Sequence, residues 1–177
     1  VLPAMADFIQ PGRDMFVFDY IVPQPDWMYQ GFDAVIKTID ENLAEAEKKI
    51  REANTAEEQV SYLSKIDTWK AMKMCLEATI RYARHFSRLA KIIAENFETD
   101  PKRKEELLRI SETCDKVPAQ PPEHLWEAMQ FDHFVQVAYR LEWNNAAWSW
   151  HQDYWHWPFY KKDVLEEKNL TREEAIE

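Results

Sequence analysis

Glycine and cysteine are both scarce in this chain, which has two of each among 177 residues. Glycine supplies the positive-φ positions of tight turns and phosphate-binding loops, so its scarcity argues against a turn-rich β fold and against a nucleotide-binding loop. The two cysteines, Cys75 and Cys114, lie far apart in segments of helical pattern. They provide no disulfide framework and no thiolate metal cluster, and we interpret both as buried free thiols of a reducing compartment.

Long hydrophobic runs are also missing, because no apolar stretch of this sequence approaches the roughly 20 residues that cross a bilayer. The formal net charge of −10 repels polyanions, and Lys and Arg do not alternate with aromatic residues on a common face. We therefore expect no membrane and no nucleic acid among the partners, and a cytoplasmic location. The chain begins Val-Leu-Pro, without an initiator Met or a charged leader, so we expect it to be a fragment of a longer protein.

The arrangement of apolar residues predicts a mostly α-helical chain. Residues 1–25 contain four prolines around an apolar stretch at 15–22, which indicates an extended segment with one short strand. A helix is then expected from a cap at Asp26 to about Glu52, because apolar residues recur there at spacings of three and four. We interpret residues 1–177 as a single helical segment, since no linker divides them.

Further helices follow from local start signals. Thr55 and Glu58 form a capping box that opens a long helix to about Phe97, and Asp100-Pro101 opens a third helix to Val117. A fourth helix is expected from Glu123 to about Leu141, with Trp126 in the core. Residues 143–160 are rich in tryptophan and lack a sustained period, so we expect an irregular aromatic loop, and a second capping box at 171–174 announces a fifth helix.

From the second helix onward the sequence resembles the large catalytic subunits of the pyruvate formate-lyase-like glycyl radical enzymes. The resemblance covers roughly residues 60–177 and, more loosely, 26–59. It rests on a series of short runs in the same order as in that family: Ile80-Arg-Tyr-Ala-Arg84 with Leu89-Ala90, Asp100-Pro101-Lys-Arg-Lys-Glu-Glu-Leu-Leu108, Val117-Pro118 with Gln120-Pro-Pro122, Trp126-Glu-Ala-Met-Gln130, and Leu170-Thr-Arg-Glu-Glu-Ala175. The implied fold is a helical segment of a larger α/β enzyme with a ten-stranded β/α barrel.

One segment departs from the family pattern. Where the family tends to carry Gly-Arg-x-Asp-Gln, this chain has Trp150 and His151 in place of the Gly and Arg, and Tyr154 in place of the Gln, with Asp153 in register. Replacement of polar residues by aromatic ones suits a subfamily with aromatic or hydrocarbon substrates. The chain thus resembles most the benzylsuccinate or alkylsuccinate synthase branch, which adds a hydrocarbon to fumarate, and next an arylacetate decarboxylase of the same family.

The resemblance implies a glycyl radical near the C-terminus of the full-length chain, installed by a radical SAM activating enzyme, and a thiyl radical on a mid-chain loop. Gly12, Gly31, Cys75 and Cys114 match neither context, so we expect no catalytic residue, no bound cofactor and no activity in this segment alone. The implied partners are the remainder of the same chain, the activating enzyme and small accessory subunits, in an oligomer. A different class of hypothesis is a freestanding helical module that binds a partner protein through its tryptophan-rich end.

Candidate substrate-pocket residues are Tyr20, Trp150, Asp153 and Trp155. Trp and Tyr provide large rigid apolar surfaces with a polar tip, which suits the wall of an apolar cavity. The alternatives are a contact with another subunit or domain for the aromatic segment, and a structural edge strand for Tyr20. His151, Asp153 and His156 have the composition of a two-His, one-carboxylate metal site, but they are crowded beside Pro158, and we expect no metal.

Overall fold

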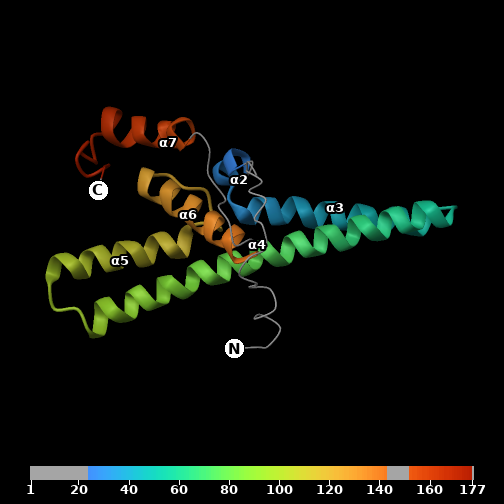
Figure 1. Ribbon diagram of the computed structural model, residues 1–177, viewed down its shortest axis with the longest axis horizontal. Coiled ribbons are helices and arrows are strands. Elements are labelled where there is room, and N and C mark those ends of the chain that lie inside the picture. The colour runs from blue at the N-terminus through green and yellow to red at the C-terminus, as the bar shows by residue number, and fades with distance from the viewer. Residues whose placement is uncertain (1–23, 143–151, 177) are drawn as a thin grey trace, which may run out of the picture.

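The structure is a computed structural model that describes residues 24–142 and 152–176, and every element in these ranges is a helix (Figure 1). The mostly α-helical prediction is confirmed. No described helix combines the length and the apolar content that a membrane span requires. In chain order the helices are α2 Gln24–Gln30, α3 Phe32–Glu52, α4 Ala56–Asn96, α5 Pro101–Lys116, α6 Leu125–Glu142, α7 Gln152–Tyr160 and the π-helix Lys161–Glu166.

Helix α4 is the central helix of the fold, because α3, α5 and α6 all contact it. Its 41 residues correspond to a length of about 60 Å at 1.5 Å per residue. Its first half packs against α3 and its second half against α5, while α6 lies beside the middle (Figure 1). The predicted capping box is present, with the Glu58 backbone N–H donating to Thr55 Oγ1 and the Thr55 N–H donating to the Glu58 carboxylate. The cap at Asp100, which opens α5, is also confirmed.

The second half of α4 lies close to α5 because the residues between the two helices are small. Ala83, Ser87, Ala90 and Ala94 recur at spacings of three and four and are buried, and the Ser87 hydroxyl lies 3.2 Å from that of Ser111. The main apolar core is formed by buried residues from each of the described helices α2 to α7, around Phe32 and Phe131.

The helix that was predicted from Asp26 to Glu52 is interrupted at Gly31, so this prediction is wrong in its start. Gly31 has a φ of 75°, which ends α2, and α3 begins at the next residue. The first N–H groups of α3 donate instead to the loop that follows α5, from Phe32 to the Pro118 carbonyl and from Asp33 to the Ala119 carbonyl, each at 2.9 Å. A contact between distant segments therefore satisfies donors that a local cap would otherwise serve.

Two further predictions need correction. Residues 152–160 of the predicted aromatic loop form helix α7, while residues 143–151 lie outside the described residues. The extended segment predicted at 1–25 ends earlier, since helix α2 begins at Gln24, and its predicted strand lies outside the described part. Residues 172–176 form turns rather than a fifth helix, although the Thr171 and Glu174 capping hydrogen bonds are present.

The two cysteines differ. Cys114 on α5 is buried in the main core, as predicted, whereas Cys75 on α4 is exposed. The prediction of two buried thiols is wrong for Cys75. Apolar residues occur on several sides of α4, so their spacing does not show which positions the neighbouring helices leave exposed.

Candidate functional site

The predicted pocket residues are only partly described by the structure. Tyr20 and Trp150 lie outside the described residues. Asp153 is exposed in the first turn of α7, and Trp155 is half-buried and packs against the main core. Asp153 and Trp155 are separated by about 200° around an α-helix, so α7 places them on different faces.

Helix α7 has an inner and an outer face. The inner face carries Trp155, His156 and the buried Phe159. The outer face carries Asp153 together with Tyr154, which is 76% exposed, and Trp157, which is 51% exposed. The sequence interpretation missed Tyr154 and Trp157 as members of one outward surface. The spacing of three residues between them was visible, but Pro158 inside the segment concealed the helix, because proline removes a backbone donor and is rare in helix interiors.

Helix α2 holds the inner face of α7. The Tyr29 hydroxyl donates a hydrogen bond of 3.0 Å to the backbone carbonyl of Trp155, and the Tyr29 ring stacks on Phe159 with centroids 5.9 Å apart. Burial raises the pKa of Tyr29 above its usual value, and the nearby Tyr154 raises it further by a smaller amount. This hydroxyl therefore stays protonated and acts as a donor.

A histidine and an aspartate meet between α6 and α7. Burial lowers the pKa of His156, while the charge of Asp132 and a hydrogen bond to the Ala128 carbonyl oppose that shift. Asp132 is 4% exposed and also accepts a hydrogen bond of 2.9 Å from Gln136 Nε2. His156 is thus a neutral imidazole with a defined place against α6. Among the described residues, no group of three or more His, Cys, Asp or Glu is arranged to hold a metal ion.

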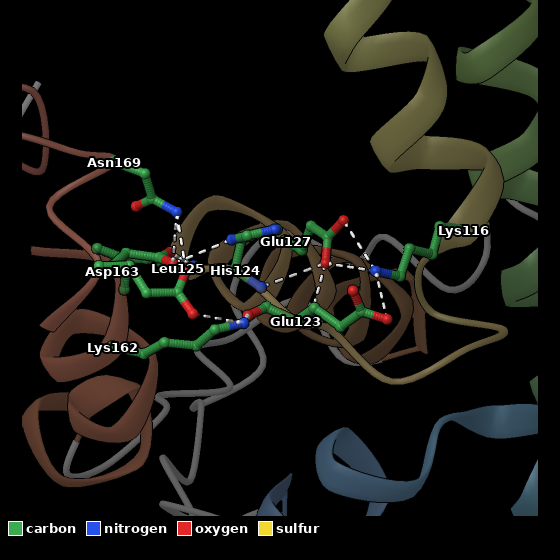
Figure 2. A network of polar contacts seen from close by, with 9 residues as sticks. Lys116, Glu123, His124, Leu125, Glu127, Lys162, Asp163 and Asn169 are labelled. Atoms are coloured by element: carbon green, nitrogen blue, oxygen red, sulfur yellow. Dashed lines mark hydrogen bonds and ion pairs between the residues drawn. The ribbon is translucent and has the colours of Figure 1, made fainter.

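A buried carboxylate joins the π-helix to the start of α6 (Figure 2). Asp163 is fully buried. Its carboxylate accepts from the Leu125 backbone N–H at 2.7 Å, from His124 Nδ1 at 3.0 Å and from Asn169 Nδ2 at 3.5 Å. Burial alone would raise the pKa of Asp163, but these donors outweigh it and hold the pKa below its usual range. The group is therefore a carboxylate that only accepts hydrogen bonds.

A second carboxylate completes the start of α6. Glu127 accepts from the backbone N–H groups of Glu123 at 2.7 Å and His124 at 3.3 Å, and Lys116 Nζ donates to it at 2.9 Å (Figure 2). Negative charge at a helix N-terminus meets unpaired N–H groups and the positive end of the helix dipole. Asp163 and Glu127 together therefore fix α6 to both α5 and the π-helix.

Trp126 extends this network along α5. Its ring stacks on the His124 ring with centroids 4.5 Å apart, and the Arg109 guanidinium carbon lies 3.7 Å from the Trp126 ring centroid. Trp126 is half-buried rather than in the core, so the prediction of a core position is wrong. A helical period places the residue on the correct helix, but it does not reveal that the indole packs between polar side chains.

A groove of about 380 Å³ lies elsewhere, between α3 and the first half of α4, and Tyr62, Trp69 and Lys65 are among its lining residues. Its lining residues belong to the part of the α3–α4 hairpin that lies away from α7 (Figure 1). None of the predicted site residues lines it. The candidate site is therefore the outer face of α7 and the contacts that hold this helix.

A family profile described as pyruvate formate lyase-like matches residues 18–177. The chain belongs to the pyruvate formate lyase-like family. A solved glycyl radical enzyme from Archaeoglobus fulgidus aligns with 90% of this chain at a TM-score of 0.76 and 32% identity. Membership of this family confirms the predicted resemblance and the prediction of a helical segment of a larger enzyme.

Two curated relatives of this pyruvate formate lyase-like chain have named activities. The probable dehydratase YbiW of Escherichia coli (strain K12) is 36% identical over 61% of this chain and 13% of its own length. The indoleacetate decarboxylase of Tractidigestivibacter scatoligenes is 27% identical over 82% of this chain and 16% of its own length. The relatives are therefore dehydratases and lyases, and they support the family without pointing to the fumarate-adding branch in particular.

This chain spans only a small part of these proteins: 13% of the Escherichia coli relative and 19% of the Archaeoglobus fulgidus chain. What this part provides is a set of helices that hold α7 with one face inward and one face outward.

Proposed function

We propose that the full-length protein is a glycyl radical lyase that adds a toluene-like or alkane-like hydrocarbon to fumarate, and that the segment around α7 forms part of its substrate wall. The observation that carries this proposal is the aromatic replacement of the family's Gly-Arg-x-Asp-Gln pattern by Trp150, His151 and Tyr154. Tyr154 extends from the outer face of α7, next to Asp153. An apolar wall favours an apolar substrate, at about 25 cal/mol per Å² removed from water.

Within this proposal the pocket residues have different tasks. Asp153, Tyr20 and Trp150 remain direct contacts with the substrate or its surroundings. Trp155 supports the wall from the inner face of α7, because it is half-buried against the core and its backbone carbonyl accepts a hydrogen bond from Tyr29. Tyr154 and Trp157 join the wall, since they are the large exposed rings of α7.

The radical chemistry of such an enzyme belongs to the remainder of the same chain. A glycyl radical in that remainder, installed by a radical SAM activating enzyme, would supply the hydrogen-atom abstraction that activates the hydrocarbon for addition to fumarate. This segment contributes no reacting atom. Small accessory subunits and an oligomeric assembly are part of the same proposal.

The decisive experiment is product analysis of the activated full-length protein. The protein is expressed without oxygen, activated by its radical SAM partner and checked for a glycine-centred doublet by electron paramagnetic resonance. It is then incubated with toluene or hexane, with and without fumarate. A substituted succinate that forms only with fumarate supports the proposal. A full radical signal without any adduct from aromatic or aliphatic hydrocarbons contradicts it.

Variants of the full-length protein separate a substrate wall from a structural contact. Trp150→Ala and Trp157→Ala should raise the KM for the hydrocarbon and leave that for fumarate nearly unchanged, because a carboxylate gains little from an apolar wall. Trp155→Ala removes a ring that packs on the core, so it should lower the melting temperature and affect both substrates alike. Equal effects of Trp150→Ala on both substrates, with loss of assembly, would show a structural contact instead.

The second candidate is decarboxylation of an arylacetate, which is favoured by the similarity to an indoleacetate decarboxylase. An arylacetate also presents an aromatic ring to the wall, but it carries its own carboxylate and needs no fumarate. Incubation of the activated protein with phenylacetate or indoleacetate distinguishes the two candidates. Release of carbon dioxide and the methylarene without fumarate supports decarboxylation and excludes fumarate addition as the main activity.

A further inference from the structure

Asp163 occupies an unusual position for a carboxylate. It is fully buried and lies within a π-helix of six residues, a wide helical turn that is frequent at functional sites. Its backbone carbonyl also accepts hydrogen bonds, from the N–H groups of Asn169 at 3.0 Å and Leu170 at 3.3 Å. Side chain and backbone of one residue thus connect the π-helix, the start of α6 and the segment that follows.

The contacts of this side chain favour a carboxylate. Every partner is a donor: the Leu125 N–H, His124 Nδ1 and Asn169 Nδ2. An amide of the same shape can keep the Leu125 N–H bond through its oxygen, but its NH₂ group then requires the other His124 tautomer and a flipped Asn169 amide. It also loses the charge that complements the N-terminus of α6. The shape of the site alone therefore does not explain why residue 163 is an aspartate. The negative charge of the side chain and its number of hydrogen-bond acceptors explain it.

The π-helix continues α7 without interruption, from Tyr160 to Lys161. A fixed point at Asp163 consequently restrains the C-terminal end of α7 relative to α6. The second fixed point is the Tyr29 hydrogen bond to the Trp155 carbonyl. Together with the burial of Phe159 on the inner face, these contacts restrain which residues α7 presents outward, among them Asp153 and Tyr154.

His124 connects Asp163 to α5. Its Nδ1 points to Asp163, and its ring stacks on Trp126 at an interplanar angle of 5°. Arg109 of α5 lies over the same indole. The orientation of the His124 ring is therefore fixed at both its edge and its face, so Asp163 is held against a rigid group.

We propose that Asp163 is a positioning residue, whose buried carboxylate sets the placement of the outer face of α7 toward the substrate. It touches no reacting atom and acts through Asp153 and Tyr154. This inference depends on the proposed function only in assuming that α7 borders the substrate, whatever that substrate is.

The test uses Asp163→Asn in the full-length protein, with Glu166→Gln as the matched control. Glu166 belongs to the same π-helix, but it is exposed and pairs with Lys161 at 3.0 Å. Hydrogen exchange of a peptide covering 152–166 reports the placement of α7 without any substrate. Loss of hydrogen bonds to a charged group should speed exchange in Asp163→Asn by about tenfold or more. Glu166→Gln should leave the exchange unchanged, and peptides of α3 should not respond to either substitution.

The kinetic arm uses whichever substrate the wild-type protein converts. Asp163→Asn should raise the KM for that substrate severalfold, while the glycyl radical content per protein and the melting temperature stay close to wild type. His124→Phe, which keeps a ring against Trp126 but removes the hydrogen bond to Asp163, should change KM in the same direction and by less.

Two results would overturn the inference. In the first, exchange in 152–166 and KM are both unchanged in Asp163→Asn. In the second, activity falls only in proportion to folded, radical-bearing protein, which would make Asp163 a purely structural cap. A wild-type protein that forms no succinate adduct would remove the proposed function but not this inference, because the exchange experiment needs no substrate and KM is measured on the actual one.

Discussion

Gly31 lies against Ala119 so closely that a β-carbon on Gly31 would be 2.7 Å from the Ala119 carbonyl oxygen. This contact joins the start of α3 to the loop after α5, where the Val117–Pro118 peptide bond is cis. Since the first N–H groups of α3 donate to this loop, the close approach is part of the architecture. A side chain at Gly31 cannot be accommodated without moving backbone.

Gly31→Ala is therefore expected to be strongly destabilising. The backbone conformation of φ 75° and ψ 157° costs a non-glycine residue about 1–3 kcal/mol, and the clash with Ala119 adds to this. Hydrogen exchange of the Phe32 and Asp33 amides in the full-length protein measures the effect. Ala34→Gly, at an exposed position of α3, is the control and should cost only about 0.5–1 kcal/mol. Equal effects of the two substitutions would contradict the claim that the backbone conformation and the close contact at residue 31 require a glycine.

Trp126 and Arg109 should be energetically coupled. An Arg over an indole contributes about 0.5–2 kcal/mol, depending on exposure. In a double-mutant cycle of Arg109→Ala and Trp126→Ala, we expect a coupling energy of about 1 kcal/mol. The pair Arg103→Ala and Trp126→Ala is the control, because Arg103 bonds to Glu106 instead and should show additive effects. Additivity of the Arg109 pair would show that the stacking seen in the structure contributes nothing to stability.

His156 should make the protein less stable in mild acid. Burial lowers its pKa in the folded state, so the unfolded chain, with a His pKa of about 6.5, binds the proton first. The contribution to stability is complete above that pH and is lost as the pH falls through it toward the folded pKa. Melting temperatures between pH 8 and pH 5 should show this loss, and His156→Leu should reduce it.

His133→Gln, at an exposed position of α6, is the control for the pH series. It should retain the acid dependence of the wild-type protein. The same acid dependence in His156→Leu would mean that another group is responsible for it.

Cys114 should be chemically inert in the folded protein. Burial raises the pKa of its thiol to about 11, so very little reactive thiolate exists near neutral pH. In a Cys75→Ser background, mass spectrometry after iodoacetamide treatment at pH 8 should find the Cys114 peptide unmodified, and modified after denaturation. Rapid alkylation of Cys114 without denaturation would show that this part of the core opens.

Local signals in the sequence were sufficient for α4 and α5. The Thr55 and Glu58 capping box and the Asp100-Pro101 start depend only on residues within one turn, so these ends could be predicted without the fold. The ordered runs from Ile80 to Ala175 were likewise enough to place the chain in its family. Of the candidate site, the sequence identified α7 as the unusual segment and named Asp153 and Trp155 within it.

The tertiary structure alone decided the break at Gly31, the helical state of 152–160 and the separate faces of Asp153 and Trp155. It also decided the partner of Asp163, which looks like one acidic residue among many until α6 is placed beside it. Capping boxes and helical periods operate over three or four residues, whereas Asp163 and Leu125 are 38 residues apart. No local pattern determines which distant N–H a carboxylate will meet, because that depends on how the helices pack, and packing is a property of all the apolar faces together.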